Sequence, residues 1–193
     1  MKRITVYCGS SPGTEPIYEQ EARALGKLLA EKGMELVYGG AKIGLMGAVA
    51  DGVLAHKGKV IGVLPGFLKA KEVAHESLTA LILVDTMHER KMKMHDLSDG
   101  IIALPGGYGT LEELFEMLTW SQLGLHQKPI GLLNTNGFYK ELLAFIDTMI
   151  QKGFLKQVNR DMLLVSDSIP DLLAKMQAYQ APVVEKWMDR GKT

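Results

Sequence analysis

Short runs of apolar and β-branched residues alternate along this chain with segments in which apolar residues recur at helical spacing. Several of the runs are apolar throughout, which is the pattern of strands buried on both faces of a parallel sheet. The expected strands are Arg3–Cys8, Glu35–Tyr38, Val60–Leu64, Leu81–Val84, Ile101–Leu104, Ile130–Leu133 and Leu163–Val165.

Four amphipathic stripes between these runs predict helices. They are Tyr18, Ala22, Leu25 and Leu29, with Gly33 as a stop; Met46, Val49, Ala50, Val53 and Leu54; Leu111, Leu114, Phe115 and Leu118; and Leu142, Phe145, Ile146 and Met149. Alternating strands and helices indicate right-handed βαβ crossovers. We therefore expect one α/β domain over residues 1–193, a doubly wound and mainly parallel sheet of about seven strands with helices on both faces.

Composition and charge narrow the class of protein. The 193 residues suffice for one sizeable core, and 47% are apolar. Lys+Arg and Asp+Glu both count 22, so no basic excess favours nucleic acid and no acidic excess favours disorder. The single cysteine, Cys8, cannot form a disulfide within the chain, and its apolar surroundings favour a buried, inert thiol.

Targeting and metal-binding patterns are missing from the sequence. The apolar run after Met1–Arg3 is shorter than a secretory h-region, and no run approaches the ~20 residues that span a bilayer. We therefore expect a cytoplasmic protein without a membrane partner. The five histidines show no metal-binding pattern, and we expect neither a metal nor a redox cofactor.

Ligands of doubly wound sheets bind beyond the carboxyl ends of the strands, where three turns here are rich in small residues. The first turn, 8–13, is either a plain turn or a ligand site in which Ser10 bonds the ligand. The second turn, 39–47, contains four glycines. Its bare N–H groups, including those of Gly39 and Gly40, favour an anion cradle over tight packing around Gly44 and Gly47.

The third turn, 104–113, joins a buried strand to an amphipathic helix and contains Pro105-Gly106-Gly107-Tyr108-Gly109. The unpaired N–H groups at a helix N-terminus stabilise a phosphate. Glu112 stands where a dinucleotide fingerprint needs Gly or Ala, and no Gly-Lys-Ser/Thr sequence makes a Walker loop. The turn therefore suggests a mononucleotide or a sugar phosphate.

Glu113 has two interpretations. Thr110-x-x-Glu113 fits a capping box with Thr110 as N-cap, but Glu113 is also a carboxylate one turn from the expected phosphate. The apolar stripe of this helix centres near Leu118, and Glu112, Glu113 and Glu116 all point away from it. Periodicity does not choose among the three glutamates.

Arg90 lies on the face that Met87, Met94 and Leu97 mark as the inner side of a helix, whereas Lys93 points elsewhere. A guanidinium on a core face is costly unless an anion pairs with it. That anion is a ligand phosphate or catalytic carboxylate, which we favour, or the partner in an internal salt bridge.

Two motifs together resemble the LOG ("lonely guy") family of cytokinin-activating phosphoribohydrolases. They are Met87-His88-Glu89-Arg90-Lys91 and Pro105-Gly106-Gly107-Tyr108-Gly109-Thr110-Leu111-Glu112-Glu113. Further matching stretches cover nearly the whole chain: Val37–Gly40, Gly44–Gly47, Thr119-Trp120, Gln122–Gly124 and Lys128–Leu132. The resemblance implies a Rossmann-like fold, a homodimer, and hydrolysis of N6-modified adenosine 5′-monophosphates or AMP to the free base and ribose 5-phosphate.

By matching position, Arg90 and Glu113 would be the catalytic pair. The residues that the resemblance places on the nucleotide are Lys91, Gly107, Tyr108, Gly109, Thr110, Leu111, Glu112 and Thr119, with Glu72 as a further substrate-contacting glutamate. Ser10, Gly39, Gly40, Gly106 and Met87 complete the candidate substrate-binding set. Glu113 would stabilise the oxocarbenium-like transition state and orient water, and Arg90 would hold the phosphate or the carboxylate.

Three other functions compete with this one. Relatives have carried the label lysine decarboxylase, but nothing here singles out a Schiff-base lysine, and we reject that activity. A non-catalytic nucleotide-binding or carrier module of the same fold is the main alternative. Binding of single-stranded nucleic acid is disfavoured by zero net charge and the lack of an aromatic and basic platform.

Overall fold

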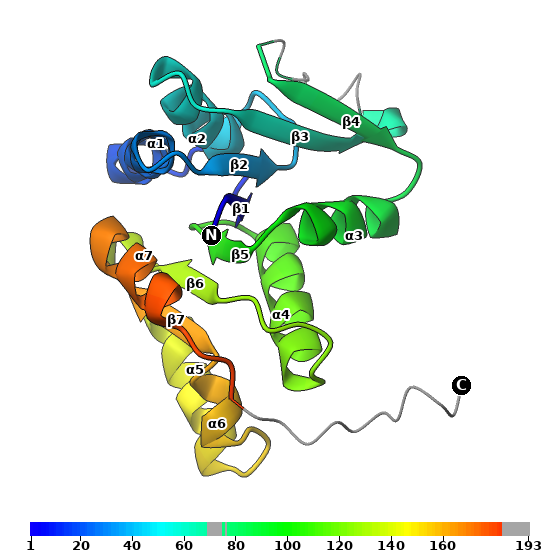
Figure 1. Cartoon of the computed structure of the whole chain (residues 1–193). Helices are drawn as coiled ribbons and strands as arrows, with labels where there is room; N and C mark the ends of the chain where they lie inside the picture. Colours follow the sequence, from blue (N-terminus) through cyan, green and yellow to red (C-terminus); the bar gives the residue numbers. More distant parts are fainter. Residues whose placement is uncertain (69–74, 76, 183–193) are drawn as a thin grey trace.

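The computed structural model describes residues 1–68, 75 and 77–182, and its strands form one parallel sheet (Figure 1). The sheet has seven strands in the order β4-β3-β2-β1-β5-β6-β7. Every neighbouring pair is parallel. The strands are β1 Arg3–Tyr7, β2 Glu35–Tyr38, β3 Val60–Pro65, β4 Ala80–Val84, β5 Gly100–Ala103, β6 Ile130–Leu133 and β7 Leu163–Ser166.

Helices cover both faces of this sheet, as the alternating pattern predicts. One buried cluster joins the sheet to α1, α2 and α7, and a second joins its other face to α3, α4 and α5. The helices are α1 Pro16–Glu31, α2 Gly44–Ala55, α3 Met87–Leu97, α4 Tyr108–Gln122, α5 Lys140–Gln151, α6 Gln157–Arg160 and α7 Ile169–Ala178, with short 3-10 turns at Gly66–Leu68 and Thr135–Gly137. The expected fold class is confirmed.

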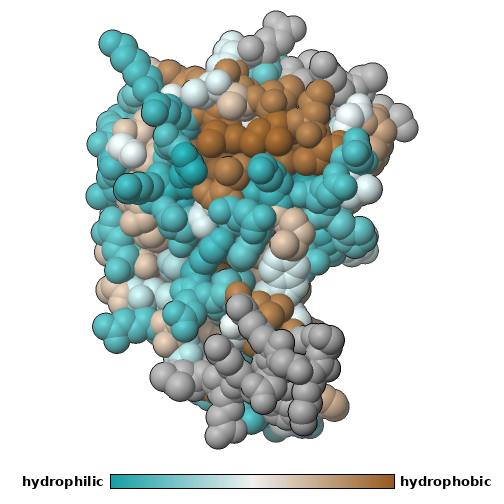
Figure 2. Space-filling view, turned by 45° about the vertical axis from the view of Figure 1, so that its right-hand side comes forward, coloured by the Kyte–Doolittle hydropathy of each residue, from teal (hydrophilic) through white to brown (hydrophobic). Residues whose placement is uncertain are grey.

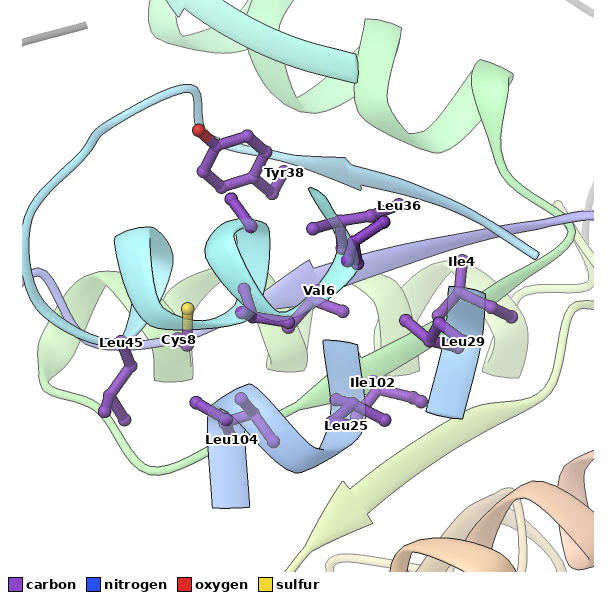
Figure 3. Packing of buried hydrophobic residues seen from close by; sticks show 14 of the residues in the cluster. Ile4, Val6, Cys8, Leu25, Leu29, Leu36, Tyr38, Leu45, Ile102 and Leu104 are labelled. Atoms are coloured by element: carbon purple, nitrogen blue, oxygen red, sulfur yellow. The ribbon is translucent and has the colours of Figure 1, made fainter. Parts of the chain in front are cut away.

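The first cluster packs aliphatic side chains of alternate strand positions against α1 and α2. Ile4 and Val6 of β1 meet Leu25 of α1 in this layer (Figure 3). Cys8 lies at its margin, 8% exposed, and burial raises the pKa of its thiol. The thiol therefore stays protonated at neutral pH, in agreement with the inert role expected for it.

Three details of the expected helices are wrong. The apolar face of α4 centres on Leu114 and Met117, which are fully buried, while Leu118 is only partly buried. Phe145 of α5 is 57% exposed although it belongs to the predicted stripe. Met87, at the first turn of α3, is 38% exposed. Spacing along the sequence gives only the relative angles of residues around a helix. Packing against a neighbouring element can therefore shift the centre of the buried face by one residue.

The strand order reverses direction beside β1. The chain adds β2, β3 and β4 on one side of β1 and then crosses to place β5 on the other side. The turns after β1 and β5 thus meet at a topological switch point, where Gly9 N–H donates to the Pro105 carbonyl at 3.0 Å. Open α/β sheets bind their ligands in the crevice at this point.

The edge of the sheet at β4 leaves apolar surface exposed. In Figure 2, hydrophobic side chains gather over the upper half of the face that includes β4 and α3. Exposed large hydrophobic residues of β4, α3 and the turn after β3 are Leu83, Met87, Met92 and Phe67. No helix among the described residues has the length and apolar character needed to cross a membrane.

Candidate functional site

A cavity of about 350 Å³ opens at the switch point and collects residues from five separate segments, one of which is the 3-10 turn after β3 that supplies Leu68. The turn after β1, the first turn of α2, helix α3 and the start of α4 all contribute to its walls. The described lining residues are Cys8, Gly9, Ser10, Met46, Leu68, Met87, Arg90, Gly107, Tyr108, Gly109, Thr110, Glu112 and Glu113. Its volume lies within the range of small-molecule sites.

Arg90 reaches this cavity from α3 across the ends of two strands. Its Nε donates to the Val63 carbonyl of β3 at 3.1 Å, and its Nη2 donates to the Gly39 carbonyl after β2 at 3.0 Å. The side chain is 6% exposed. In the described part of the chain no carboxylate forms a salt bridge with it, so the internal salt bridge considered from the sequence is not observed there. Two carbonyls orient the guanidinium, and its other N–H groups can meet an anion in the cavity.

The start of α4 supplies a second group of donors. Gly107 is the N-cap residue and Tyr108 the first helical residue, so the N–H groups of Tyr108, Gly109 and Thr110 precede the first intrahelical bond, from Leu111 N–H to the Gly107 carbonyl. Unpaired N–H groups and the helix dipole favour a negative charge here. The cavity wall therefore carries an anion-binding helix N-terminus.

Of the two interpretations of Glu113, the capping box with Thr110 as N-cap is not observed. Thr110 is the third residue of α4 and is 4% exposed, and the N-cap Gly107 receives no side-chain bond. Glycines at 106 and 107 let the chain turn into the helix earlier than a hydroxyl cap would, since a Cβ on Gly106 would collide with the Thr110 side chain. Glu113 therefore does not serve as the reciprocal partner of a capping box.

Glu113 is a partly buried carboxyl group facing Arg90 in the same cavity. Burial raises its pKa to about 7, with the positive charge of Arg90 opposing the increase and the negative charge of Glu112 adding to it. A carboxyl group with a pKa near neutrality can both accept and return a proton under physiological conditions.

Lys91 follows Arg90 but faces a different direction. Its Nζ lies 2.5 Å from Glu112 and 3.1 Å from Glu116, both on α4, and its side chain is 7% exposed. Burial opposes the charge of Lys91, but the bonds to the two glutamates outweigh this effect and raise its pKa. Lys91 does not line the cavity. Helical spacing alone did not predict that this lysine is buried.

Two glycines of the second turn, Gly39 and Gly40, also lie off the cavity. A Cβ on Gly39 would collide with Arg90 Nη2, so this glycine makes room for the guanidinium. Gly40 has a φ of +82° and packs against Leu64 and Leu81. Of this turn and the helix after it, only Met46 lines the cavity.

The remaining predicted site residues divide into two groups. Ser10, Met87 and Glu112 line the cavity. Gly106, Leu111 and Thr119 do not line it: Gly106 packs between two turns, Leu111 joins the core, and the Thr119 hydroxyl donates to the Phe115 carbonyl at 2.7 Å. Glu72 lies outside the described residues.

Four lining residues were not among the predicted site residues: Cys8, Gly9, Met46 and Leu68. The positions of Cys8 and Gly9 directly after β1 could have indicated them, because ligands gather at strand ends. Met46 and Leu68 carry no local signal, since Met46 is an apolar residue in the first turn of α2 and Leu68 an apolar residue in a short 3-10 turn. In the described part of the chain, no group of three or more His, Cys, Asp or Glu side chains could hold a metal ion.

Fold and cavity together define a Rossmann-like α/β protein whose polar site combines a helix N-terminus, a guanidinium and a carboxyl group. A family model described as "Possible lysine decarboxylase" matches residues 46–176. The cytokinin riboside 5′-monophosphate phosphoribohydrolase LOG of Oryza sativa subsp. japonica is 47% identical over 178 residues, which are 92% of this chain and 74% of that protein. A phosphoribohydrolase of the same description from Arabidopsis thaliana is 45% identical over 92% of this chain and 84% of its own length. This chain belongs to the LOG family of phosphoribohydrolases.

Solved structures agree on the fold. A molybdenum cofactor binding protein from the phototrophic bacterium Rippkaea orientalis superposes with a TM-score of 0.69 at 23% identity. The match covers 92% of this chain and 97% of that chain. At this identity the likeness concerns the architecture, and function must be argued from the site.

Proposed function

We propose that this protein hydrolyses the N-glycosidic bond of adenosine 5′-monophosphate or of its N6-modified forms. The products are the free base and ribose 5-phosphate. The observation that carries the proposal is the convergence of Glu113 and Arg90 on one cavity at the N-terminus of α4. Membership of the LOG family supports the same substrate class, because its rice and Arabidopsis relatives are named for this reaction.

The 5′-phosphate is expected at the N–H groups that begin α4. Gly107, Tyr108, Gly109 and Thr110 line the cavity there, and the helix dipole adds to their attraction for an anion. Arg90, whose guanidinium is oriented by hydrogen bonds to two carbonyls, adds a formal positive charge to the partial charges of these N–H groups. A nucleotide held by its phosphate then lies with its ribose toward Glu113.

Hydrolysis breaks the bond between the anomeric carbon and the base nitrogen, and the electron pair of that bond leaves with the base. The carboxylate of Glu113 stabilises the positive charge that develops on the ribose ring. It also orients a water molecule and takes one of its protons as the water oxygen bonds to the anomeric carbon. The departing base gains a proton, so water is divided between the two products.

Product analysis tests this reaction directly. Incubation with AMP, isopentenyl-AMP, GMP and CMP, followed by chromatography, should show free base and ribose 5-phosphate from the adenine nucleotides. Binding of AMP without product would instead favour a carrier module of the same fold. Absence of both binding and turnover would contradict the proposal that the cavity binds a nucleotide.

Lysine decarboxylation is not favoured by the cavity. Such a reaction through pyridoxal phosphate needs a lysine amine that can form a Schiff base within reach of substrate. No lysine lines the cavity in the described part of the chain. Lys91, the buried lysine of α3, is paired with two carboxylates instead.

We further propose that the protein acts as a homodimer through the apolar area at β4 and α3. Leu83 and Met92 are 51% and 45% exposed, and contiguous apolar surface of this kind marks association sites. Changing both to Glu should convert a dimer into a monomer in light scattering. Phe154, 87% exposed after α5, is the matched control, and its change to Glu should leave the mass unaltered. A monomeric wild-type protein would contradict the proposal.

A further inference from the structure

Lys91 is the one buried lysine side chain of α3, and its partners are two of the three glutamates near the start of α4. Glu112 directly precedes Glu113, and Glu116 follows one helical turn later. Three carboxylates thus lie within five residues of one helix, and like charges at such spacing repel one another. The Lys91 ammonium group contacts Glu112 and Glu116, and Glu113 lines the cavity beside Glu112 without contacting this ammonium group.

The contacts of Lys91 bridge the two helices that supply the site. Arg90 and Lys91 are neighbours on α3, and Glu112 and Glu113 are neighbours on α4. An ion pair between Lys91 and Glu112 therefore brings Arg90 and Glu113 to the same cavity through adjacent backbone positions. The bond to Glu116 adds a second attachment one turn along α4.

We propose that Lys91 is a positioning residue that does not bind the nucleotide: by clamping Glu112 and Glu116 it keeps the Glu113 carboxyl group in place and able to ionise opposite Arg90. This inference rests on the proposed hydrolysis. It assigns Lys91 an indirect role, whereas the family resemblance places it on the substrate. The burial of its side chain and its absence from the described cavity lining support the indirect role.

The surroundings of Glu113 determine the expected direction of the effect. Arg90 and Lys91 of α3 are positive, and Glu112 and Glu116 of α4 are negative. Tyr7 of β1 and Cys8 after it also lie in the field of Glu113, but burial raises the pKa of both, so they stay neutral. Burial raises the pKa of Glu113 to about 7, Lys91 lowers it, and the two neighbouring glutamates raise it.

Charge removal in opposite senses tests the proposal. K91M leaves the negative charges of Glu112 and Glu116 uncompensated, which should raise the pKa of Glu113. The acid limb of the pH profile, where kcat/KM falls as Glu113 becomes protonated, should therefore move to higher pH by about one unit from its wild-type position near 7. E112Q/E116Q should move the acid limb to lower pH, because the positive charge of Lys91 then acts on Glu113 without the two neighbouring negative charges. The triple variant K91M/E112Q/E116Q should return close to the wild-type limb.

The size of the loss should depend on pH. K91M should lose roughly tenfold in kcat/KM at pH 6.5 and recover most of it at pH 9, where Glu113 is ionised in every variant. K91R retains the charge and should keep the wild-type limb. A raised KM at every pH with an unmoved limb would overturn the proposal and place Lys91 on the nucleotide.

A readout without turnover separates this inference from the reaction itself. Carboxyl carbon NMR of glutamate-labelled protein, with E113Q used to assign the signal, should show the Glu113 midpoint rising in K91M and falling in E112Q/E116Q. If the wild-type protein is inactive but the variants show these shifts, the proposed hydrolysis is refuted and the positioning role of Lys91 is supported. Active protein with an unchanged Glu113 midpoint would refute the clamp alone.

Discussion

Two glycine-rich turns follow strands of the same sheet, but they differ in what their glycines are for. After β5, Gly107 and Gly109 line the cavity, and a Cβ on either would meet no neighbouring heavy atom. After β2, Gly39 makes room for Arg90, and a Cβ on Gly44 would collide with the Ser10 backbone. Glycine therefore exposes backbone to a ligand in one turn and allows close packing in the other, and the count of glycines does not distinguish these roles.

The turn after β5 also differs in leading to ionisable groups. The helix that begins there presents Glu113 to the cavity, whereas the helix after the β2 turn presents Met46. Substitutions in the first region should consequently affect catalysis with little loss of stability. Substitutions in the second region should act through folding or through Arg90.

Glu113→Gln should have the largest effect on turnover. The amide keeps the shape of the side chain but cannot carry the charge or take a proton, so kcat should fall by at least about 100-fold while KM changes little. Steady-state kinetics with AMP at pH 8 measure this. Retention of full turnover would place the catalytic carboxyl group elsewhere.

Thermal melting of Glu113→Gln provides a second comparison. The folded-state pKa of Glu113 is raised to about 7, so the wild-type protein loses stability as pH rises from the unfolded-state value near 4.5 through 7. The amide has no such penalty. The variant should melt a few degrees higher than wild type at pH 8 and at nearly the same temperature at pH 4.5. A lower melting temperature at pH 8 would indicate a stabilising role for this carboxyl group.

Arg90→Ala should come next in effect. Loss of a charge-assisted contact to substrate is worth about 1.5–3 kcal/mol, which corresponds to roughly 10- to 150-fold in kcat/KM. The variant also leaves the Val63 and Gly39 carbonyls without their donor, so its melting temperature should fall. Arg90→Lys retains the charge and should recover part of the activity. Unchanged kinetics in a folded Arg90→Ala protein would remove the guanidinium from the site.

The smallest effects should come from the glycines, and they should separate the two turns. Gly109→Ala should raise KM several-fold by crowding the phosphate position, and it should leave the melting temperature unchanged or slightly higher. Gly44→Ala, at a φ of +59° against the Ser10 backbone, should lower the melting temperature by several degrees. Scanning calorimetry and AMP kinetics on both variants measure the contrast. Equal stability of the two would show that the β2 turn is not constrained by packing.

Several features of the site could be predicted from the amino-acid pattern. Arg90 falls on the inner face of its helix by spacing with Met94, and the glycines before α4 lie after a continuously buried strand. These are local relations between residues a few positions apart, and the geometry of a helix or a strand is sufficient to interpret them. Burial of a guanidinium at a strand end then indicates a partner of opposite charge.

Other features required contacts between distant segments. Thr110 resembles an N-cap in the sequence, but contact with Gly106 and an earlier helix start place it inside α4. Glu112, Glu113 and Glu116 are equivalent by periodicity. Because α4 packs beside α3, Glu112 and Glu116 form ion pairs with Lys91, and Glu113 lines the cavity without such a pair.

By itself, the sequence determined the parallel α/β sheet, its helices on both faces and the turns at which a ligand would bind. Repeating apolar patterns carry that information, because burial depends on the period of each element. Tertiary structure alone decided which glutamates line the cavity, which glycines pack against neighbouring segments and which carboxylates pair with Lys91. Spacing along a helix gives relative angles around its axis, and only the neighbouring helix and sheet set the direction from which those angles are measured.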